Sequence, residues 1–91
     1  MKIVINTCYG GFGLSDEALK LYNEYSEHDE TNYYHIERDD PALVRVVEEL
    51  DEKADGNYAS LKVVEIPDGV EWCIDEYDGM EHIAEEHSTW N

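Results

Sequence analysis

The dipeptide Asp78-Gly79 lies between two stretches that alternate polar and apolar residues, and it constrains the fold more than any other feature. Asp-Gly favours the two-residue hairpin turn whose backbone twist matches that of the flanking strands. We therefore predict strands over residues 70–77 and 80–86, joined by this turn. A two-residue turn also sets the cross-strand pairs, which are Tyr77 with Met80, Glu76 with Glu81, Asp75 with His82, Ile74 with Ile83, Cys73 with Ala84 and Trp72 with Glu85.

Capping residues predict two helices earlier in the chain. Ser15 is a good N-cap, and the two acids after it suit the positive end of a helix dipole, so a helix should run to about Tyr25. Asp40 and Pro41 are typical of the cap and the first position of a second helix. Apolar residues then follow at helical spacing, and Gly56 is a plausible stop.

Three further strands complete the expected order. Residues 2–7 and 60–66 are rich in β-branched and apolar side chains, and residues 33–36 form a short edge-strand candidate. The order β-α-β-α-β-β-β indicates an α+β fold in which two helices pack on one face of a small antiparallel or mixed sheet that ends in a C-terminal hairpin. With 91 residues, the chain should form a single domain over residues 1–91.

The charge is strongly one-sided. The chain has six Lys and Arg residues and 23 Asp and Glu residues, which gives a net charge of −17. No Lys or Arg follows Lys62. Such a field repels nucleic acid and anionic membranes and steers the chain toward basic protein surfaces. The partner we expect is therefore a protein with a basic groove. Solubility and a salt-loving host are alternative explanations for the acidity.

The acids also oppose local folding rules in two places, which suggests a role outside folding. Acids near the C-terminal half of the second helix oppose its dipole, and Glu76 would face Glu81 across the hairpin, a pair of like charges that normally destabilises a sheet. Alternate acids on a strand lie about 6.6 Å apart, so the hairpin could present a row of charge that imitates a phosphate backbone. A solvated acidic face with no partner is the alternative. The predicted partner-binding residues are Asp75, Glu76, Asp78, Glu81, Glu85 and Glu86, with Glu48, Glu49 and Glu52 as a second patch.

The segment Cys8 to Ser15 contains three glycines and offers the main alternative site. It matches neither a phosphate-binding loop nor a dinucleotide fingerprint, and it reads as a tight turn with positive φ values. Cys8 has no recognisable histidine partner, and the histidines and acids of residues 82–87 match no standard metal spacing. We therefore predict no catalytic, cofactor-binding or metal-binding residue. A small enzyme or ligand-binding domain centred on this turn is the competing hypothesis.

The N-terminal residues do not have the pattern of a secretory signal, and no apolar stretch approaches membrane-spanning length. Cys8 and Cys73 are then expected to be reduced thiols in the cytoplasm. Composition leaves the oligomeric state open between monomer and homodimer.

Four segments carry a resemblance to a known group: MKIVINTCYGGFGLS, RDDPALVRVVEEL, LKVVEIPDGVEW and EYDGMEHIAEEHSTW. They resemble a group of short proteins encoded by bacteriophages and prophages, over nearly the whole chain. Relatives in that group carry a longer insertion at residues 26–32, and no catalytic residue carries over because the group has no established activity. The resemblance implies an anti-defence protein, such as an anti-CRISPR inhibitor of a CRISPR-Cas effector. A passive phage structural or assembly protein is the alternative.

Overall fold

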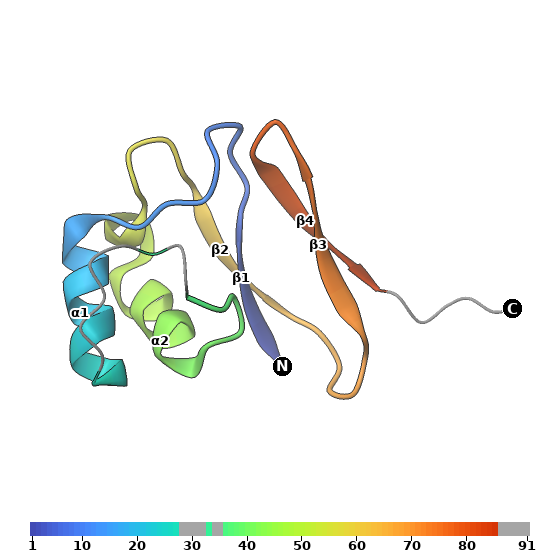
Figure 1. Ribbon diagram of the computed structural model, residues 1–91, viewed down its shortest axis with the longest axis horizontal. Coiled ribbons are helices and arrows are strands. Elements are labelled where there is room, and N and C mark those ends of the chain that lie inside the picture. The colour runs from blue at the N-terminus through green and yellow to red at the C-terminus, as the bar shows by residue number, and fades with distance from the viewer. Residues whose placement is uncertain (28–32, 34–35, 86–91) are drawn as a thin grey trace, which may run out of the picture.

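The computed structural model describes residues 1–27, 33 and 36–85 (Figure 1). Its elements in chain order are β1 (Lys2–Asn6), α1 (Asp16–Ser26), α2 (Pro41–Leu50), the short 3₁₀ helix η1 (Asp51–Ala54), β2 (Leu61–Glu65), β3 (Trp72–Tyr77) and β4 (Met80–Glu85). β1 pairs with β2, and β3 pairs with β4, both antiparallel. The predicted α+β class with a C-terminal hairpin is confirmed, with the strands divided between two small sheets.

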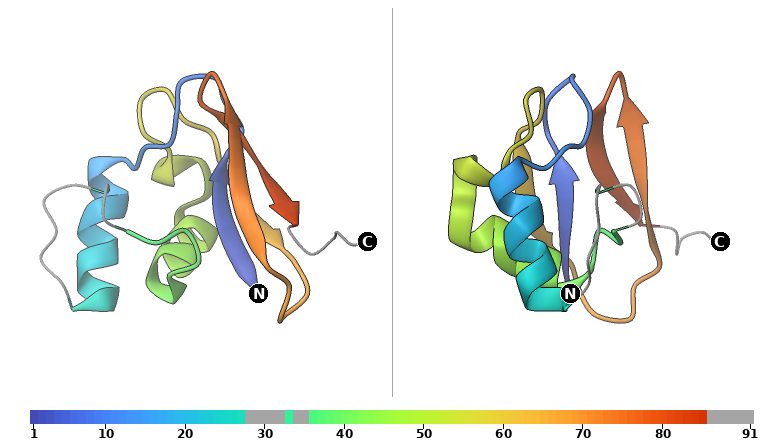
Figure 2. Two further views of the ribbon diagram at one scale, coloured as in Figure 1. Left: turned by 45° about the vertical axis from the view of Figure 1, so that its right-hand side comes forward. Right: turned by 60° about the vertical axis from the view of Figure 1, so that its left-hand side comes forward.

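The β1–β2 sheet lies between the helices and the β3–β4 hairpin (Figures 1 and 2). Val4 packs into the core on the helix side, whereas Ile3 and Ile5 pack against the hairpin. Because both faces of β1 are covered, its apolar residues form a continuous run rather than an alternating one. α2 packs directly on β1 and β2, and α1 packs on α2.

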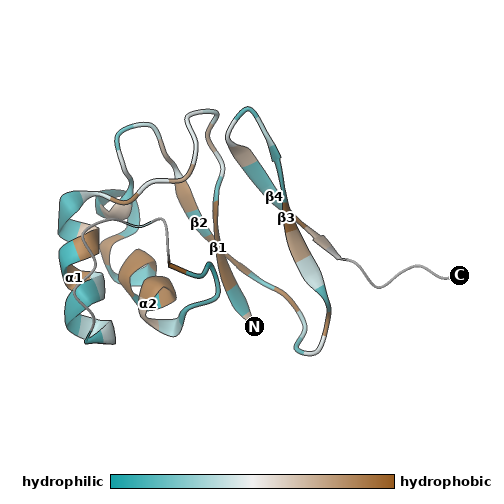
Figure 3. Ribbon diagram, viewed as in Figure 1, coloured by the Kyte–Doolittle hydropathy of each residue, from teal (hydrophilic) through white to brown (hydrophobic). Residues whose placement is uncertain are grey.

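The helices begin where the sequence predicts. The Ser15 hydroxyl accepts a hydrogen bond from the Ala18 N–H, and an Asp40 carboxylate oxygen accepts one from the Ala42 N–H. The second oxygen of Asp40 accepts the Tyr22 hydroxyl at 2.8 Å, which joins α1 to the start of α2. α2 is largely apolar along its length (Figure 3) and buries four of its residues, which are Leu43, Val44, Val46 and Val47.

The hairpin has the predicted register at all six pairs from Trp72–Glu85 to Tyr77–Met80. Asp78 and Gly79 have φ values of 51° and 91°, as the two-residue turn requires. Trp72 and the Ile74–Ile83 pair pack against the buried isoleucines of β1. This contact holds the hairpin against the sheet.

Two expectations need correction. α2 does not continue to Gly56: it ends at Leu50, because Asp51 turns the chain at a φ of 51° and η1 follows. Gly56 instead donates its N–H to the carbonyl of Gly13. The strand expected at residues 33–36 is not formed by Tyr33 or Ile36, while residues 34–35 lie outside the described part.

Within the described ranges, no helix has both the length and the apolar character needed to cross a membrane.

Candidate functional site

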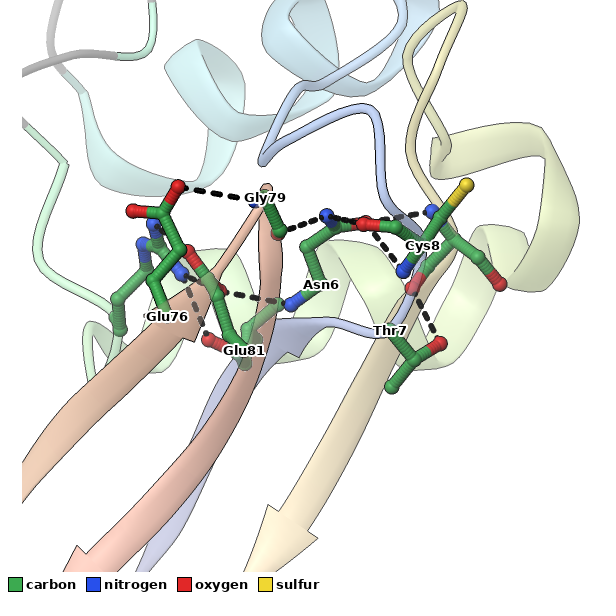
Figure 4. Close-up of polar contacts among 9 residues, drawn as sticks. Asn6, Thr7, Cys8, Glu76, Gly79 and Glu81 are labelled. Atoms are coloured by element: carbon green, nitrogen blue, oxygen red, sulfur yellow. Dashed lines mark hydrogen bonds and ion pairs between the residues drawn. The ribbon is translucent and has the colours of Figure 1, made fainter.

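The outward face of the hairpin does not carry the expected row of carboxylates. The alternation of the strands places Asp75 outward, opposite His82, with 3.5 Å between a carboxylate oxygen of Asp75 and Nε2 of His82. Glu76 and Glu81 fall on the other face, together with the apolar residues that meet β1. The exposed acids of the described hairpin are therefore Asp75 on the outward face, Asp78 in the turn, and Glu76, whose carboxylate stays exposed beside the turn and accepts the Gly79 N–H at 3.0 Å (Figure 4).

Glu81 is a buried structural residue, so its assignment to the partner-binding surface is wrong. Its side chain is 6% exposed, and it forms two contacts with the Arg38 guanidinium, at 2.5 and 2.8 Å. It also accepts the backbone N–H of Asn6 at 2.8 Å. A carboxylate on an inward-facing strand position must be paired in this way, because an unpaired buried charge is very costly. The side chain of Glu85 and all of Glu86 lie outside the described part.

Arg38 links several layers of the fold. Its guanidinium lies 3.8 Å from the ring centre of Phe12, and its carbonyl accepts the Val4 N–H at 2.9 Å. Phe12 in turn meets Tyr33 edge-to-face, with 5.8 Å between ring centres. Arg38 therefore connects β1, β4 and the loop that leads into α1.

The second predicted patch lies on the helix side, across the β1–β2 sheet from the hairpin (Figure 1). Glu48 pairs with Lys2 at 2.7 Å, and its hydrogen bond raises the pKa of Lys2 above the usual value. Glu49 accepts the hydroxyl of Tyr25, which raises the pKa of Tyr25, and lies 3.8 Å from Arg45. Glu52 is exposed. The two predicted patches thus face different sides of the molecule, and basic side chains partly neutralise this one.

Three loops meet at the end of the molecule where β1 ends, β2 begins and the hairpin turns (Figures 1 and 2). We call this end the loop edge, and it consists of residues 7–13, 55–60 and 77–80. Asn6, which is fully buried, lies at its centre. Its amide NH₂ donates to the carbonyls of Cys8 and Gly79, and its oxygen accepts the N–H groups of Ser60 and Cys8 (Figure 4). One side chain therefore binds all three loops.

The loops approach so closely that only glycine fits at their contacts. A Cβ on Gly79 would lie 2.5 Å from the nitrogen of Gly11 and 2.6 Å from the carbonyl oxygen of Tyr9. A Cβ on Gly10 would lie 2.1 Å from the carbonyl oxygen of Tyr58. The positive φ expected in the glycine-rich turn occurs at Gly11, at 97°. Backbone contact thus explains much of the glycine content of this segment.

A cavity of about 360 Å³ lies beside the loop edge, between residues 10–16 and 55–58, with Tyr33 in its wall. Cys8 is not among its lining residues. Across the described part of the chain, no three His, Cys, Asp or Glu side chains are grouped so that they could hold a metal ion.

Sequence reasoning named Tyr9 only as part of the segment Cys8 to Ser15 and gave no site role to Asn6, Tyr58 or Tyr77, all of which the structure places at the loop edge. The three tyrosines are exposed, and each lies within two residues of a glycine. The proximity of each tyrosine to a glycine, and so to a turn, was the feature of the sequence that could have predicted its exposure. Comparison with known protein families, characterised proteins and solved structures found no match.

Proposed function

We propose that this protein is a phage-encoded inhibitor without catalytic activity, which acts in the cytoplasm of the host cell. It binds the basic groove of a host nucleic-acid-binding defence protein, such as a CRISPR-Cas effector, and occupies the place of the nucleic acid. The phage origin rests on the sequence resemblance, and the mode of binding rests on the charge. The protein itself binds neither nucleic acid nor membrane directly.

The observation that carries this proposal is the excess of acidic side chains over basic ones. The net charge of −17 means that at least 17 acidic residues lack a lysine or arginine of their own. Moreover, three of the six basic residues are already paired with acids, in the bridges Lys2–Glu48, Arg38–Glu81 and Arg45–Glu49. A field of this kind favours fast, salt-sensitive association with a basic surface.

The acids at the hairpin tip are the stronger candidates for contact with the partner. Asp75, Glu76 and Asp78 are exposed, and they belong to a part of the chain without Lys or Arg. In the helix-side patch, by contrast, Glu48 and Glu49 each have a basic neighbour. We therefore assign the partner-binding face to the hairpin tip, with the helix-side patch contributing to the long-range field.

The test is a tagged pull-down from a bacterial host lysate at low and then moderate salt. We expect one basic nucleic-acid-binding protein to be retained and to be released by salt or by competing DNA. The triple variant Asp75→Asn, Glu76→Gln and Asp78→Asn should weaken retention, because it removes three charges while it keeps side-chain shape. If this variant retains the partner as well as the wild-type protein does, the acids at the hairpin tip do not imitate the nucleic acid.

The matched control neutralises the same number of charges on the helix side, through Glu48→Gln, Glu49→Gln and Glu52→Gln. This control should retain the partner better than the hairpin-tip variant does. If the wild-type protein retains nothing, the acidity is passive, as in a structural or assembly protein.

A ligand-binding function at the glycine-rich turn is the second candidate. The cavity there, of about 360 Å³, falls within the usual size range of small-molecule pockets. A fragment screen by NMR tests it: binding that shifts the amide signals of residues 10–16 and 55–58 together would support a ligand site. A screen without such shifts would remove the candidate.

A further inference from the structure

Three tyrosines are the large apolar side chains most exposed in the described part of the chain. Tyr9, Tyr58 and Tyr77 are 62%, 76% and 72% exposed. Tyr9 and Tyr58 lie in two of the three segments of the loop edge, and Tyr77, the last residue of β3, begins the third. These segments, far apart in the sequence, meet at one end of the molecule (Figures 1 and 2). Single exposed apolar residues need no explanation, but a group of them marks an interaction surface.

The backbone that carries these tyrosines is held firmly. Gly10 lies against the carbonyl of Tyr58, and Gly79 lies against the carbonyl of Tyr9. The buried amide of Asn6 bonds to all three loops. Tyrosine has only two rotatable side-chain bonds, so a rigid backbone gives a large contact surface at a small entropy cost on binding.

The loop edge is also negative. Its residues 7–13, 55–60 and 77–80 contain no Lys or Arg, and their acids are Asp55 and Asp78. Asp75 and Glu76, both exposed, adjoin it on β3. An aromatic and acidic surface suits arginine in particular, because a planar guanidinium can stack on a ring while it pairs with a carboxylate.

The protein holds its own arginines in this manner twice. Arg38 lies 3.8 Å from the ring centre of Phe12 and is ion-paired with Glu81. Arg45 lies 3.9 Å from the ring centre of Tyr25 and contacts the acid four residues further along α2. In both cases a ring and a carboxylate share one guanidinium.

We propose that the loop edge binds an arginine-bearing segment of the partner protein, with guanidinium groups stacked on Tyr9, Tyr58 and Tyr77 and paired with the neighbouring carboxylates. This inference rests on the proposed function and names both the contact face and the side chain it recognises. The loop edge selects arginine over lysine, whereas charge attraction alone would not distinguish between them.

The test uses two peptides, nine arginines and nine lysines long, titrated into the ¹⁵N-labelled protein at low salt. Binding curves give affinities, and the NMR spectrum reports both the location of binding and the integrity of the fold. We expect the arginine peptide to bind about tenfold more tightly, since each cation–π contact contributes modestly and three act together. The largest shifts should fall on amides of the loop edge, such as those of Gly10, Tyr58 and Gly79.

The decisive variant replaces all three tyrosines, as Tyr9→Ser, Tyr58→Ser and Tyr77→Ser. Their exposure means that the fold should survive, and the NMR spectrum verifies this. We expect the variant to bind the arginine peptide about tenfold more weakly and to bind both peptides alike. The helix-side variant Glu48→Gln, Glu49→Gln and Glu52→Gln serves as the control and should keep the preference for arginine.

The possible failures are distinguishable. Equal affinity of the wild-type protein for both peptides, or unchanged arginine binding in the tyrosine variant, would overturn this inference and leave the proposed function intact. NMR shifts confined to α2 when the arginine peptide binds would also overturn this inference and leave the proposed function intact. Failure of the wild-type protein to bind either peptide at low salt would overturn both proposals, because a basic ligand would then not be attracted at all.

Discussion

Arg38 and Glu81, 43 residues apart in the sequence, form a two-pronged ion pair that closes the open edge of β1. The carbonyl of Arg38 accepts the N–H of Val4 at 2.9 Å, and the carboxylate of Glu81 accepts the N–H of Asn6 at 2.8 Å. Two N–H groups on the edge of β1 away from β2 therefore have acceptors without a third paired strand. An edge covered in this way is protected from pairing with another chain.

Arg38→Ala should lower the free energy of unfolding by about 3–5 kcal/mol, because it leaves the Glu81 carboxylate buried without a counter-ion. Arg45→Ala is a matched control, since Arg45 also lies over a ring and pairs with a glutamate, but on the exposed surface. Its cost should be about 0–1 kcal/mol from the ion pair. Urea unfolding measures both. Equal costs for the two variants would show that the Arg38–Glu81 pair is not buried in solution.

Asn6→Ala should destabilise the loop edge by several kcal/mol, since each buried backbone group left without a partner costs about 1–3 kcal/mol. The groups affected belong to Cys8, Ser60 and Gly79. Hydrogen exchange should accelerate at the amides of Cys8 and Ser60. The neighbouring change Thr7→Val removes one exposed hydrogen bond to the Ser60 carbonyl and should cost about 1 kcal/mol or less. Similar effects of the two variants would contradict the central role of Asn6.

Gly79→Ala should cost more than Gly69→Ala, although both residues have positive φ values, 91° and 83°. At Gly69 an added Cβ meets no atom within 4 Å, so only backbone strain of about 1–2 kcal/mol applies. At Gly79 the same atom would collide with the backbone of Tyr9 and Gly11, which adds a further cost of about 1–3 kcal/mol. Urea unfolding measures the free energy of unfolding of both variants, and the difference between them gives the cost of the collision at Gly79. Equal costs would mean that the loops are not in contact.

The hydrogen bond from Tyr25 to Glu49 raises the pKa of Tyr25 above its ordinary value of 10.0. A raised pKa in the folded state means that this contact stabilises the fold below about pH 10 and is lost as the pH rises through the raised value. An NMR titration of the tyrosine ring carbons should show the raised pKa in the wild-type protein. Glu49→Gln should bring it down toward 10.0, and an unchanged titration would show that the hydrogen bond does not form in solution.

The hairpin register and both helix starts were predictable because they depend on local geometry. The Asp78-Gly79 turn fixes six cross-strand pairs by chain connectivity alone. A side-chain oxygen at Ser15 or Asp40 bonds to an N–H only two or three residues away. Neither relation needs knowledge of the rest of the fold.

The sequence indicated the inward position of Glu81 but not its ion pair. The alternation placed it on the same face as Ile74 and Ile83, which indicated an inward position. Its partner Arg38, however, belongs to a distant segment that carries no pattern pointing to β4. The end of α2 was likewise missed, because the turn at Asp51 depends on a backbone conformation that the periodicity of the apolar residues does not encode.

By itself, the sequence determined the fold class, the hairpin pairing, the helix starts and the large negative charge, since each follows from composition or from neighbouring residues. The tertiary structure decided which acids are exposed, which acid is paired inside and which distant segments meet at the loop edge. These depend on contacts between residues 43 to 75 positions apart, such as Arg38–Glu81 and Asn6–Glu81. Only the packing of the hairpin against β1 brings such residues together.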